Sequence, residues 1–354
     1  MTRRLILHTG TMKSGTSFLQ NVLAANKARL ADEHGILFPG RRWRQQVSAV
    51  QDLIERGGPG QPPLEPDGPW ETLAAEVRDW PGDAVVSMEF LGPRREPKIR
   101  RILQSFPDHD LQVVMTARDL ARQVPAMWQE SVQNAAVTTW PDFLAAVRDT
   151  PEGPGPGRWF WNHQGIAAMY SRWQDVVGRD HLTLVTVPPP GSPAGLLWER
   201  FAGLLGVDPA GCSLDVRANP SIGVASALVL RDLNERLAAD PLDKRDYQRV
   251  VKAALGKQAL ASRKAEEPGL GMDEPWVAPL AETEVAKLRA LDPRLRGDLA
   301  ELEPHPVRGI HTDDVSASDR LEAALDALAA SVRESVTLLG SRTTGRQRRT
   351  GASS

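Results

Sequence analysis

The sequence contains a single cysteine, Cys212, and no long apolar run. One cysteine excludes an intrachain disulfide and a cysteine-based zinc cluster. No stretch approaches the roughly 18 consecutive apolar residues that a membrane-spanning helix needs, so we expect no membrane partner. The formal net charge is only −2 over 354 residues, which predicts no general affinity for nucleic acid or anionic membranes. Any anion-binding site must therefore be a local feature.

The segment ahead of the first apolar run is very short. Only residues 1–4 precede it, which leaves no room for a signal sequence and favours a cytoplasmic protein. The apolar fraction of 41% and the charged fraction of 25% are ordinary for a soluble globular protein. We find no internal repeat, and the sequence leaves the oligomeric state open.

Short apolar runs alternate with helix-type spacing through the first part of the chain. The segments expected to form strands are the run that starts at Leu5 and residues 35–40, 83–91, 111–117 and 182–187. This alternation predicts an α/β fold of three layers, in which a central parallel sheet is flanked by helices. From residue 225 onward helical spacing dominates, which predicts a helical C-terminal extension; the expected helices are 225–237, 247–260, 282–291 and 318–338.

The composition also suggests a division of the chain into three regions. We expect residues 1–215 to form the α/β core and residues 216–340 to form the helical extension, packed on the same domain. Residues 341–354 are polar, basic and poor in apolar side chains, which predicts a disordered tail.

The most informative stretch lies directly after the first predicted strand. Gly10 and Gly15 bracket a turn of small polar residues, and helical spacing begins at Ser17. The N–H groups of such a turn and the unpaired donors of the helix's first turn converge on one point, where the helix dipole adds about half a positive charge. Lys13 supplies a full charge. The stretch therefore predicts an anion-binding site, although a tight turn with a solvated Lys13 is the alternative.

This turn differs from the phosphate-binding loop of nucleoside triphosphatases, G-x-x-x-x-G-K-[ST]. The frame Gly10-x4-Gly15 is present, but Thr16 stands where the lysine belongs, and Lys13 lies inside the loop. Triphosphate chemistry needs that lysine on the β- and γ-phosphates. The shift therefore argues against a triphosphatase.

The pattern x-K-[ST]-G-T-[ST] after a first strand resembles the 5′-phosphosulfate loop of the sulfotransferases that use 3′-phosphoadenosine 5′-phosphosulfate (PAPS). The resemblance implies a P-loop-like fold, PAPS as the sulfuryl donor and adenosine 3′,5′-bisphosphate as the product. It implies that the donor is held by these loop residues: Thr11, Lys13, Ser14, Gly15, Thr16 and Ser17. Lys13 then has a catalytic role too, because a fixed cation stabilises the charge that builds on the bridging oxygen during transfer.

The same resemblance suggests two more donor ligands. In the family an arginine after a later strand grips the 3′-phosphate, and Arg118 follows residues 113–117 here. A guanidinium matches a phosphate bidentately; an ion pair between Arg118 and Asp119 is the alternative. The family pattern usually has a serine eight positions further on, where this sequence has Ala126. A late polar loop offers Asn219 as a further cofactor-binding candidate.

Sulfuryl transfer also requires a base that takes a proton from the attacking hydroxyl or amine. Family members use a histidine or a glutamate on the strand segment after the first helical unit, and Glu89 matches that position. A carboxylate partly withdrawn from water beside an anionic donor suits a general base. The alternative is a structural Glu89 that pairs with Arg94 or Arg95. His163, in an aromatic segment, is the second candidate for the base.

These observations predict a sulfotransferase that moves the sulfuryl group of PAPS in line to a hydroxyl or amine of a small-molecule or carbohydrate acceptor. Glu89 would act as the base and Lys13 would stabilise the leaving group. No metal is expected, because the sequence shows no persuasive constellation of Asp, Glu and His. The alternatives are a P-loop kinase and a nucleotide-binding protein without sulfuryl transfer. The sequence does not identify the acceptor.

Overall fold

The computed structural model describes residues 2–58, 60–216 and 221–350 and divides the chain into two compact units. The first unit comprises Met1–Gln123, Ala146–Asn219 and Glu274–His305, and the second comprises Val124–Ala145, Pro220–Asp273 and Pro306–Ser354. Each unit thus draws on three separate segments, so the units do not follow the boundary expected at residue 215. The assignment of functional domains stays a prediction.

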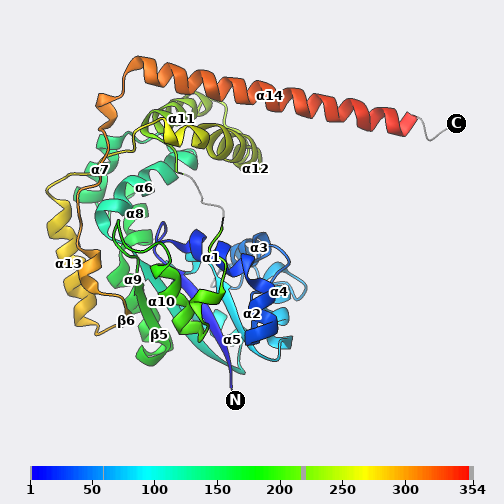
Figure 1. Ribbon diagram of the computed structural model, residues 1–354, viewed down its shortest axis with the longest axis vertical. Coiled ribbons are helices and arrows are strands. Elements are labelled where there is room, and N and C mark those ends of the chain that lie inside the picture. The colour runs from blue at the N-terminus through cyan, green and yellow to red at the C-terminus, as the bar shows by residue number, and fades with distance from the viewer. Residues whose placement is uncertain (1, 59, 217–220, 351–354) are drawn as a thin grey trace. The chain divides into compact units, whose positions relative to one another are not determined.

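A parallel sheet forms the centre of the first unit (Figure 1). The strands of this sheet are β1 (Arg3–Gly10), β2 (Ile36–Leu37), β3 (Asp83–Ser87), β4 (His109–Ala117), β5 (Leu182–Thr186) and β6 (Arg294–Arg296). Their order is β2-β3-β1-β4-β5-β6, and every neighbouring pair is parallel. The structure confirms the predicted α/β class with a central parallel sheet.

Alternate strand residues enter two buried cores, one on each face of the sheet. In β1, Ile6 belongs to one core, and Leu5 and Leu7 belong to the other. The first core is completed by α1 (Thr16–Ala25), α2 (Lys27–His34) and α10 (Leu196–Leu205). The second is completed by α3 (Trp43–Glu55), α4 (Pro69–Asp79), α5 (Glu96–Ser105), α9 (Ile166–Val177) and α13 (Val277–Ala290). Burial on both faces explains why the central strands are continuous apolar runs in the sequence.

Shorter elements complete the first unit. They are η1 (Glu89–Leu91), α8 (Pro156–Gln164), η2 (Arg179–His181), η3 (Pro209–Gly211) and η6 (Leu299–Leu302).

The second unit is helical and has its own packed interior. Its elements include α6 (Leu120–Gln133) from residue 124 onward, α7 (Trp140–Asp149) up to residue 145, α11 (Val224–Leu237), α12 (Lys244–Asp246), the π-helical segment η4 (Tyr247–Leu260), η5 (Arg263–Ala265), η7 (Thr312–Asp314) and α14 (Ala317–Thr350). The rings of Trp128 and Trp140 pack with centroids 5.6 Å apart. Asn234 Nδ2 donates to the carbonyl oxygens of Val132 and Ala136 at 2.8 and 3.0 Å. These bonds tie α11 to the end of α6.

Several elements differ from the sequence-based expectation. The strand expected over 83–91 stops at Ser87, and the chain turns into η1, in which the Leu91 N–H donates to the Met88 carbonyl oxygen. The short strand β6 was not predicted, because Arg294–Arg296 has no apolar run and pairs only with β5. α14 continues to Thr350, through most of the segment expected to be a disordered tail. Among the residues described, no helix is both long and apolar enough to cross a bilayer.

Candidate functional site

The predicted loop lies between β1 and α1, at the carboxyl edge of the sheet. Gly15 has a φ of 81°, and a Cβ on it would lie 2.5 Å from Leu197 Cδ2. A Cβ on Gly10 would lie 2.3 Å from the carbonyl oxygen of Thr116 in β4. Lys13 has a φ of 64°, a left-handed conformation that costs a residue other than glycine about 1–2 kcal/mol. The loop is therefore a defined and strained shape in which both glycines are required.

Hydrogen bonds beneath the loop hold this shape. Ser14 is fully buried, and its Oγ donates to the Thr11 carbonyl oxygen at 2.6 Å. The same Oγ lies 2.7 Å from Thr116 Oγ1 on β4. The Thr11 N–H donates to the Thr116 carbonyl oxygen at 3.0 Å. The side chain of Ser14, expected to be a donor to the anion, thus supports the loop from below.

Two glutamines attach the loop to its surroundings. Gln123 Nε2 donates to Thr11 Oγ1 at 3.0 Å, and Gln164 Nε2 donates to the Met12 carbonyl oxygen at 2.9 Å. The Oε1 atom of each glutamine is buried and has no hydrogen-bond partner among the described residues. Neither glutamine was predicted from the sequence to lie at the site. Gln123 lies in the first turn of α6 and Gln164 at the end of α8, and neither belongs to a recognisable sequence motif.

The start of α1 faces the same loop. Among the residues that the structure describes, no side chain caps this helix at its N-terminus, and the N–H groups of its first turn have no acceptor within the helix. Thr16 is buried and Ser17 is half-buried at this end. Unpaired donors and the positive end of the helix dipole therefore meet the loop that carries Lys13, which is the geometry of an anion-binding site.

The strand order puts this loop between the two other predicted site residues. β1 lies between β3 and β4; Glu89 follows β3 by two residues, and Arg118 follows β4 directly. In register, His8 of β1 pairs with the last residue of β3, and Gly10 pairs with Thr116, one residue before the end of β4. The ends of three adjacent strands thus bring Glu89, the loop and Arg118 to one edge of the sheet.

Glu89 is held by a residue of α1. Gln20 Nε2 donates to Glu89 Oε2 at 3.2 Å and to the Ser87 carbonyl oxygen at 3.1 Å. Gln20 is buried one helical turn after Thr16. Within the described part of the chain, Glu89 forms no ion pair with Arg94 or Arg95, the two arginines considered as its structural partners. The role of Gln20 at the site was not predicted from the sequence. Its position four residues after Thr16 puts it one turn along the helix that starts at the loop.

Arg118 is a half-buried cation that pairs with no carboxylate of the described residues. Its Nη2 donates to the Arg122 carbonyl oxygen, and its Nε is buried with no hydrogen-bond partner among the described residues. Asp119 instead binds Arg122, through the backbone N–H at 2.9 Å and through the guanidinium. Burial lowers the pKa of Arg118 to about 10; the charge of Arg122 adds to this shift and Asp119 opposes it. Arg118 therefore stays charged at neutral pH.

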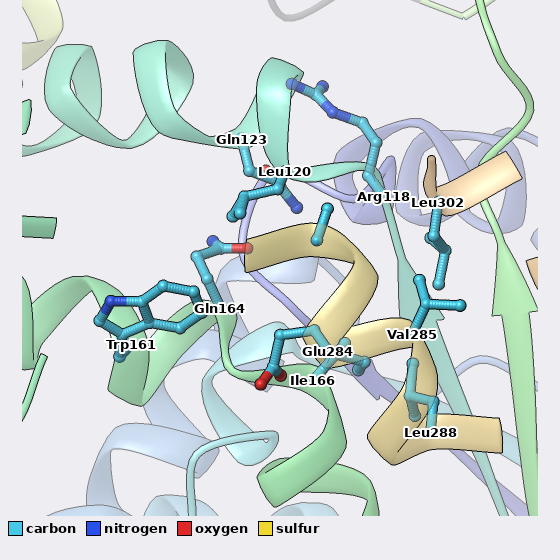
Figure 2. Close-up of a pocket in the computed structure, with 11 residues that line it drawn as sticks. Arg118, Leu120, Gln123, Trp161, Gln164, Ile166, Glu284, Val285, Leu288 and Leu302 are labelled. Carbon is cyan, nitrogen blue, oxygen red and sulfur yellow. The ribbon is translucent and has the colours of Figure 1, made fainter. Parts of the chain in front are cut away.

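A pocket lies beside the loop, with Arg118 on its wall (Figure 2). Its other polar residues are Gln123, Gln164 and Glu284. The rest of the lining is mainly apolar: Leu120, Trp161, Ile166, Ala281, Val285, Leu288 and Leu302. Figure 2 shows the Arg118 guanidinium turned toward α6, on the opposite side of the pocket from Glu284. An apolar wall with a few placed polar groups is the usual composition of a small-molecule site.

Two histidines lie near these residues. His8 is fully buried, and its Nδ1 lies 2.7 Å from Ser87 Oγ. Burial lowers the pKa of His8 to about 3, so His8 is neutral at physiological pH and packs at the end of β1. His163 Nδ1 lies 2.8 Å from the Trp159 carbonyl oxygen, to which it donates in that tautomer. Burial lowers the pKa of His163, and this hydrogen bond partly opposes the shift.

The last predicted ligand, Asn219, lies outside the described residues. Over the ranges that the structure describes, no group of three or more His, Cys, Asp or Glu side chains is placed to hold a metal ion.

Comparisons with known proteins add one similarity. No family model matches the sequence, and no curated protein matches it. Among solved structures, the chain is similar to a sulfotransferase from Alicyclobacillus acidocaldarius, with a TM-score of 0.41 and 18% sequence identity, over 71% of this chain and 96% of that chain. A similarity of this extent carries no weight for function, which must be argued from the site itself.

Proposed function

We propose that the chain is a PAPS-dependent sulfotransferase. The observation that carries the proposal is the arrangement at the carboxyl edge of the sheet. The Lys13 loop and the uncapped start of α1 lie at the end of the middle strand, with Glu89 after the strand on one side and Arg118 after the strand on the other. Sulfuryl transfer from a bisphosphorylated donor requires an anion-binding loop, a carboxylate base and a second cation.

The residues present fit such a donor. The 5′-phosphosulfate matches the loop donors, which include the N–H groups at Gly15, Thr16 and Ser17. Arg118 suits the 3′-phosphate, because its buried Nε has no partner among the described residues and a guanidinium binds phosphate bidentately. PAPS supplies the sulfuryl group that is transferred.

The chain's own residues would then act on the two ends of the reaction. The acceptor oxygen or nitrogen forms a bond to sulfur, its proton passes to Glu89, and the bond from sulfur to the 5′-phosphate oxygen breaks to leave adenosine 3′,5′-bisphosphate. Gln20 keeps the Glu89 carboxylate oriented through its 3.2 Å hydrogen bond. Lys13 stabilises the negative charge that develops on the departing oxygen, which lowers the barrier more than it lowers the ground state.

Calorimetric titration tests the binding part of this proposal. We expect the protein to bind adenosine 3′,5′-bisphosphate and to bind ATP·Mg²⁺ more weakly. Lys13→Ala should weaken the bisphosphate complex by about tenfold, because it removes a charge-assisted contact. A preference for ATP·Mg²⁺ would instead identify a nucleoside triphosphate enzyme.

Transfer of radiolabelled sulfate from PAPS to a panel of hydroxyl and amine acceptors tests the chemical part. Glu89→Gln should keep bisphosphate affinity within about twofold but lower kcat by about 100-fold or more, the usual contribution of a general base. An unchanged kcat in Glu89→Gln would remove Glu89 from the mechanism. If His163→Gln alone abolished transfer, His163 would be the base.

A further inference from the structure

Three arginines lie on neighbouring elements on the Glu89 side of the loop. Arg94 lies three residues after η1, Arg95 is the N-cap residue of α5, and Arg172 lies on α9. α5 packs against α9 in the first unit. Trp173 Nε1 donates to the Gly92 carbonyl oxygen at 3.0 Å, which fixes α9 against the segment that carries Arg94.

These arginines have no carboxylate partner among the described residues. The Nε atoms of Arg94 and Arg172 are buried and have no hydrogen-bond partner among the described residues. Other arginines of similar burial are paired with carboxylates: Arg200 with Glu301, Arg231 with Asp232 and Arg263 with Glu267. Arg94 and Arg172 are half-buried, whereas Arg95 is exposed. A half-buried charge whose inner N–H has no partner is costly to fold, so Arg94 and Arg172 require another source of compensation.

The charges within the cluster act on one another. Burial lowers the pKa of Arg94, and the charge of Arg172 lowers it further. Burial likewise lowers the pKa of Arg172, with a further contribution from Arg95. The charge of Arg94 also contributes to the lowered pKa of His163, after burial. The positive charges therefore disfavour one another, and an anion bound beside Arg94 and Arg172 would offset that effect.

The cluster adjoins the proposed reaction site. The segment after Glu89 rests on the end of β1, because a Cβ on Gly92 would lie 2.6 Å from the Gly10 carbonyl oxygen and 3.2 Å from Thr9 Oγ1. Arg118, the candidate ligand of the donor's 3′-phosphate, follows β4 on the other side of β1. The arginine cluster thus lies on the side of the base.

We propose that Arg94 and Arg172 bind an anionic group of the acceptor, a carboxylate, sulfate or phosphate ester, next to the hydroxyl or amine that Glu89 deprotonates. This inference rests on the proposed sulfotransferase function and adds the class of the acceptor: an anionic molecule. A guanidinium pair binds such an oxyanion through several charge-assisted hydrogen bonds, which also fixes the acceptor's orientation.

The test uses inorganic sulfate as the probe and the full chain saturated with adenosine 3′,5′-bisphosphate, so that the loop is occupied. We expect a further sulfate site, detected by calorimetry or by tryptophan fluorescence. Arg94→Gln and Arg172→Gln should each weaken this site by about tenfold or more and leave bisphosphate affinity within about twofold. Arg245→Gln removes the same charge from an exposed position in the second unit and should change neither constant.

Each other outcome decides the question. Unchanged sulfate affinity in both cluster variants, with folding confirmed by circular dichroism, overturns the proposal. Loss of bisphosphate affinity in Arg172→Gln also overturns it, since the cluster would then serve the donor. If the bisphosphate does not bind at all, the sulfotransferase assignment fails separately. In that case sulfate is titrated into Lys13→Ala with and without the additional change Arg172→Gln. Sulfate binding that is lost with Arg172→Gln supports an anion site at the arginines, and no such binding refutes one.

Discussion

At the scale of single residues, the candidate site depends on side chains that hold other side chains. Glu89 and Arg118 lie on opposite sides of the loop, and their immediate partners differ in kind. Glu89 accepts a hydrogen bond from Gln20, whereas Arg118 has a buried Nε with no partner among the described residues. The first arrangement orients a base, and the second leaves a charge that an anion can neutralise.

Gln20→Met tests the orientation of the base. This change keeps the volume of the side chain but removes the donor to Glu89, so we expect kcat to fall by about tenfold, or ~1.4 kcal/mol. The KM for PAPS should change little, because the donor itself is held by other residues. Gln51→Met, at an exposed position of α3, is the matched control. An unchanged kcat would mean that Gln20 only supports packing.

His8 should make the stability of the protein depend on pH. Its pKa is about 3 in the folded protein and 6.5 in the unfolded chain, so between these values the unfolded chain binds more protons. The free energy of unfolding therefore decreases as the pH falls below 6.5, by about 2 kcal/mol for this residue between pH 7 and pH 5. Urea unfolding at pH 7 and pH 5 measures this decrease in the free energy of unfolding. The decrease should be smaller by about 2 kcal/mol in His8→Gln than in the unaltered chain. The exposed control His305→Gln should retain it.

At the scale of elements, the strand, loop and helix from Arg3 to Ala25 form the functional unit. Close approach of β1 to β4 requires Gly10, and the turn into α1 requires Gly15. The left-handed backbone at Lys13 adds strain of about 1–2 kcal/mol. Strain of this kind persists only where surrounding contacts fix it, and here Ser14 and two glutamines supply them.

A pair of glycine variants separates this requirement from a general effect of adding a methyl group. Gly10→Ala should lower the free energy of unfolding by about 3 kcal/mol or more, since its Cβ meets the Thr116 carbonyl oxygen at 2.3 Å. Gly203→Ala, in α10 with nothing within 4 Å of the added Cβ, should raise it by about 0.5–1 kcal/mol. Equal effects of the two changes in urea unfolding would contradict the close-approach argument.

At the scale of the whole molecule, the predicted site residues that the structure describes all belong to the first unit. The second unit has its own interior, to which α14 contributes Ala323 and Ala327. On the same helix, Leu321 and Leu325 are 58% and 53% exposed. Donor binding and the integrity of the helical unit should therefore respond to different substitutions.

Two changes on α14 test that separation. Ala323→Asp buries a charge and should increase amide hydrogen exchange along α14, whereas Leu321→Asp, at an exposed position, should not. Both variants should bind adenosine 3′,5′-bisphosphate within about twofold of the unaltered chain. A tenfold loss of affinity in Ala323→Asp alone would show that the donor site depends on the second unit.

The sequence by itself determined the features that local patterns encode. Apolar runs and helical spacing predicted the α/β class, and the residues from Gly10 to Ser17 predicted a shaped turn between a strand and a helix, because period and glycine position constrain the nearby backbone directly. The end of β3 was predicted less well, since the turn at Glu89 depends on packing of Met88 and Leu91.

Only the tertiary structure decided which groups meet. Strand order put Glu89 and Arg118 on either side of the loop, joined Gln20 to Glu89, and gathered Arg94 and Arg172 without a carboxylate among the described residues. The physical reason is that these contacts join segments far apart in the chain. Their geometry follows from the order and register of a parallel sheet, which no local pattern specifies.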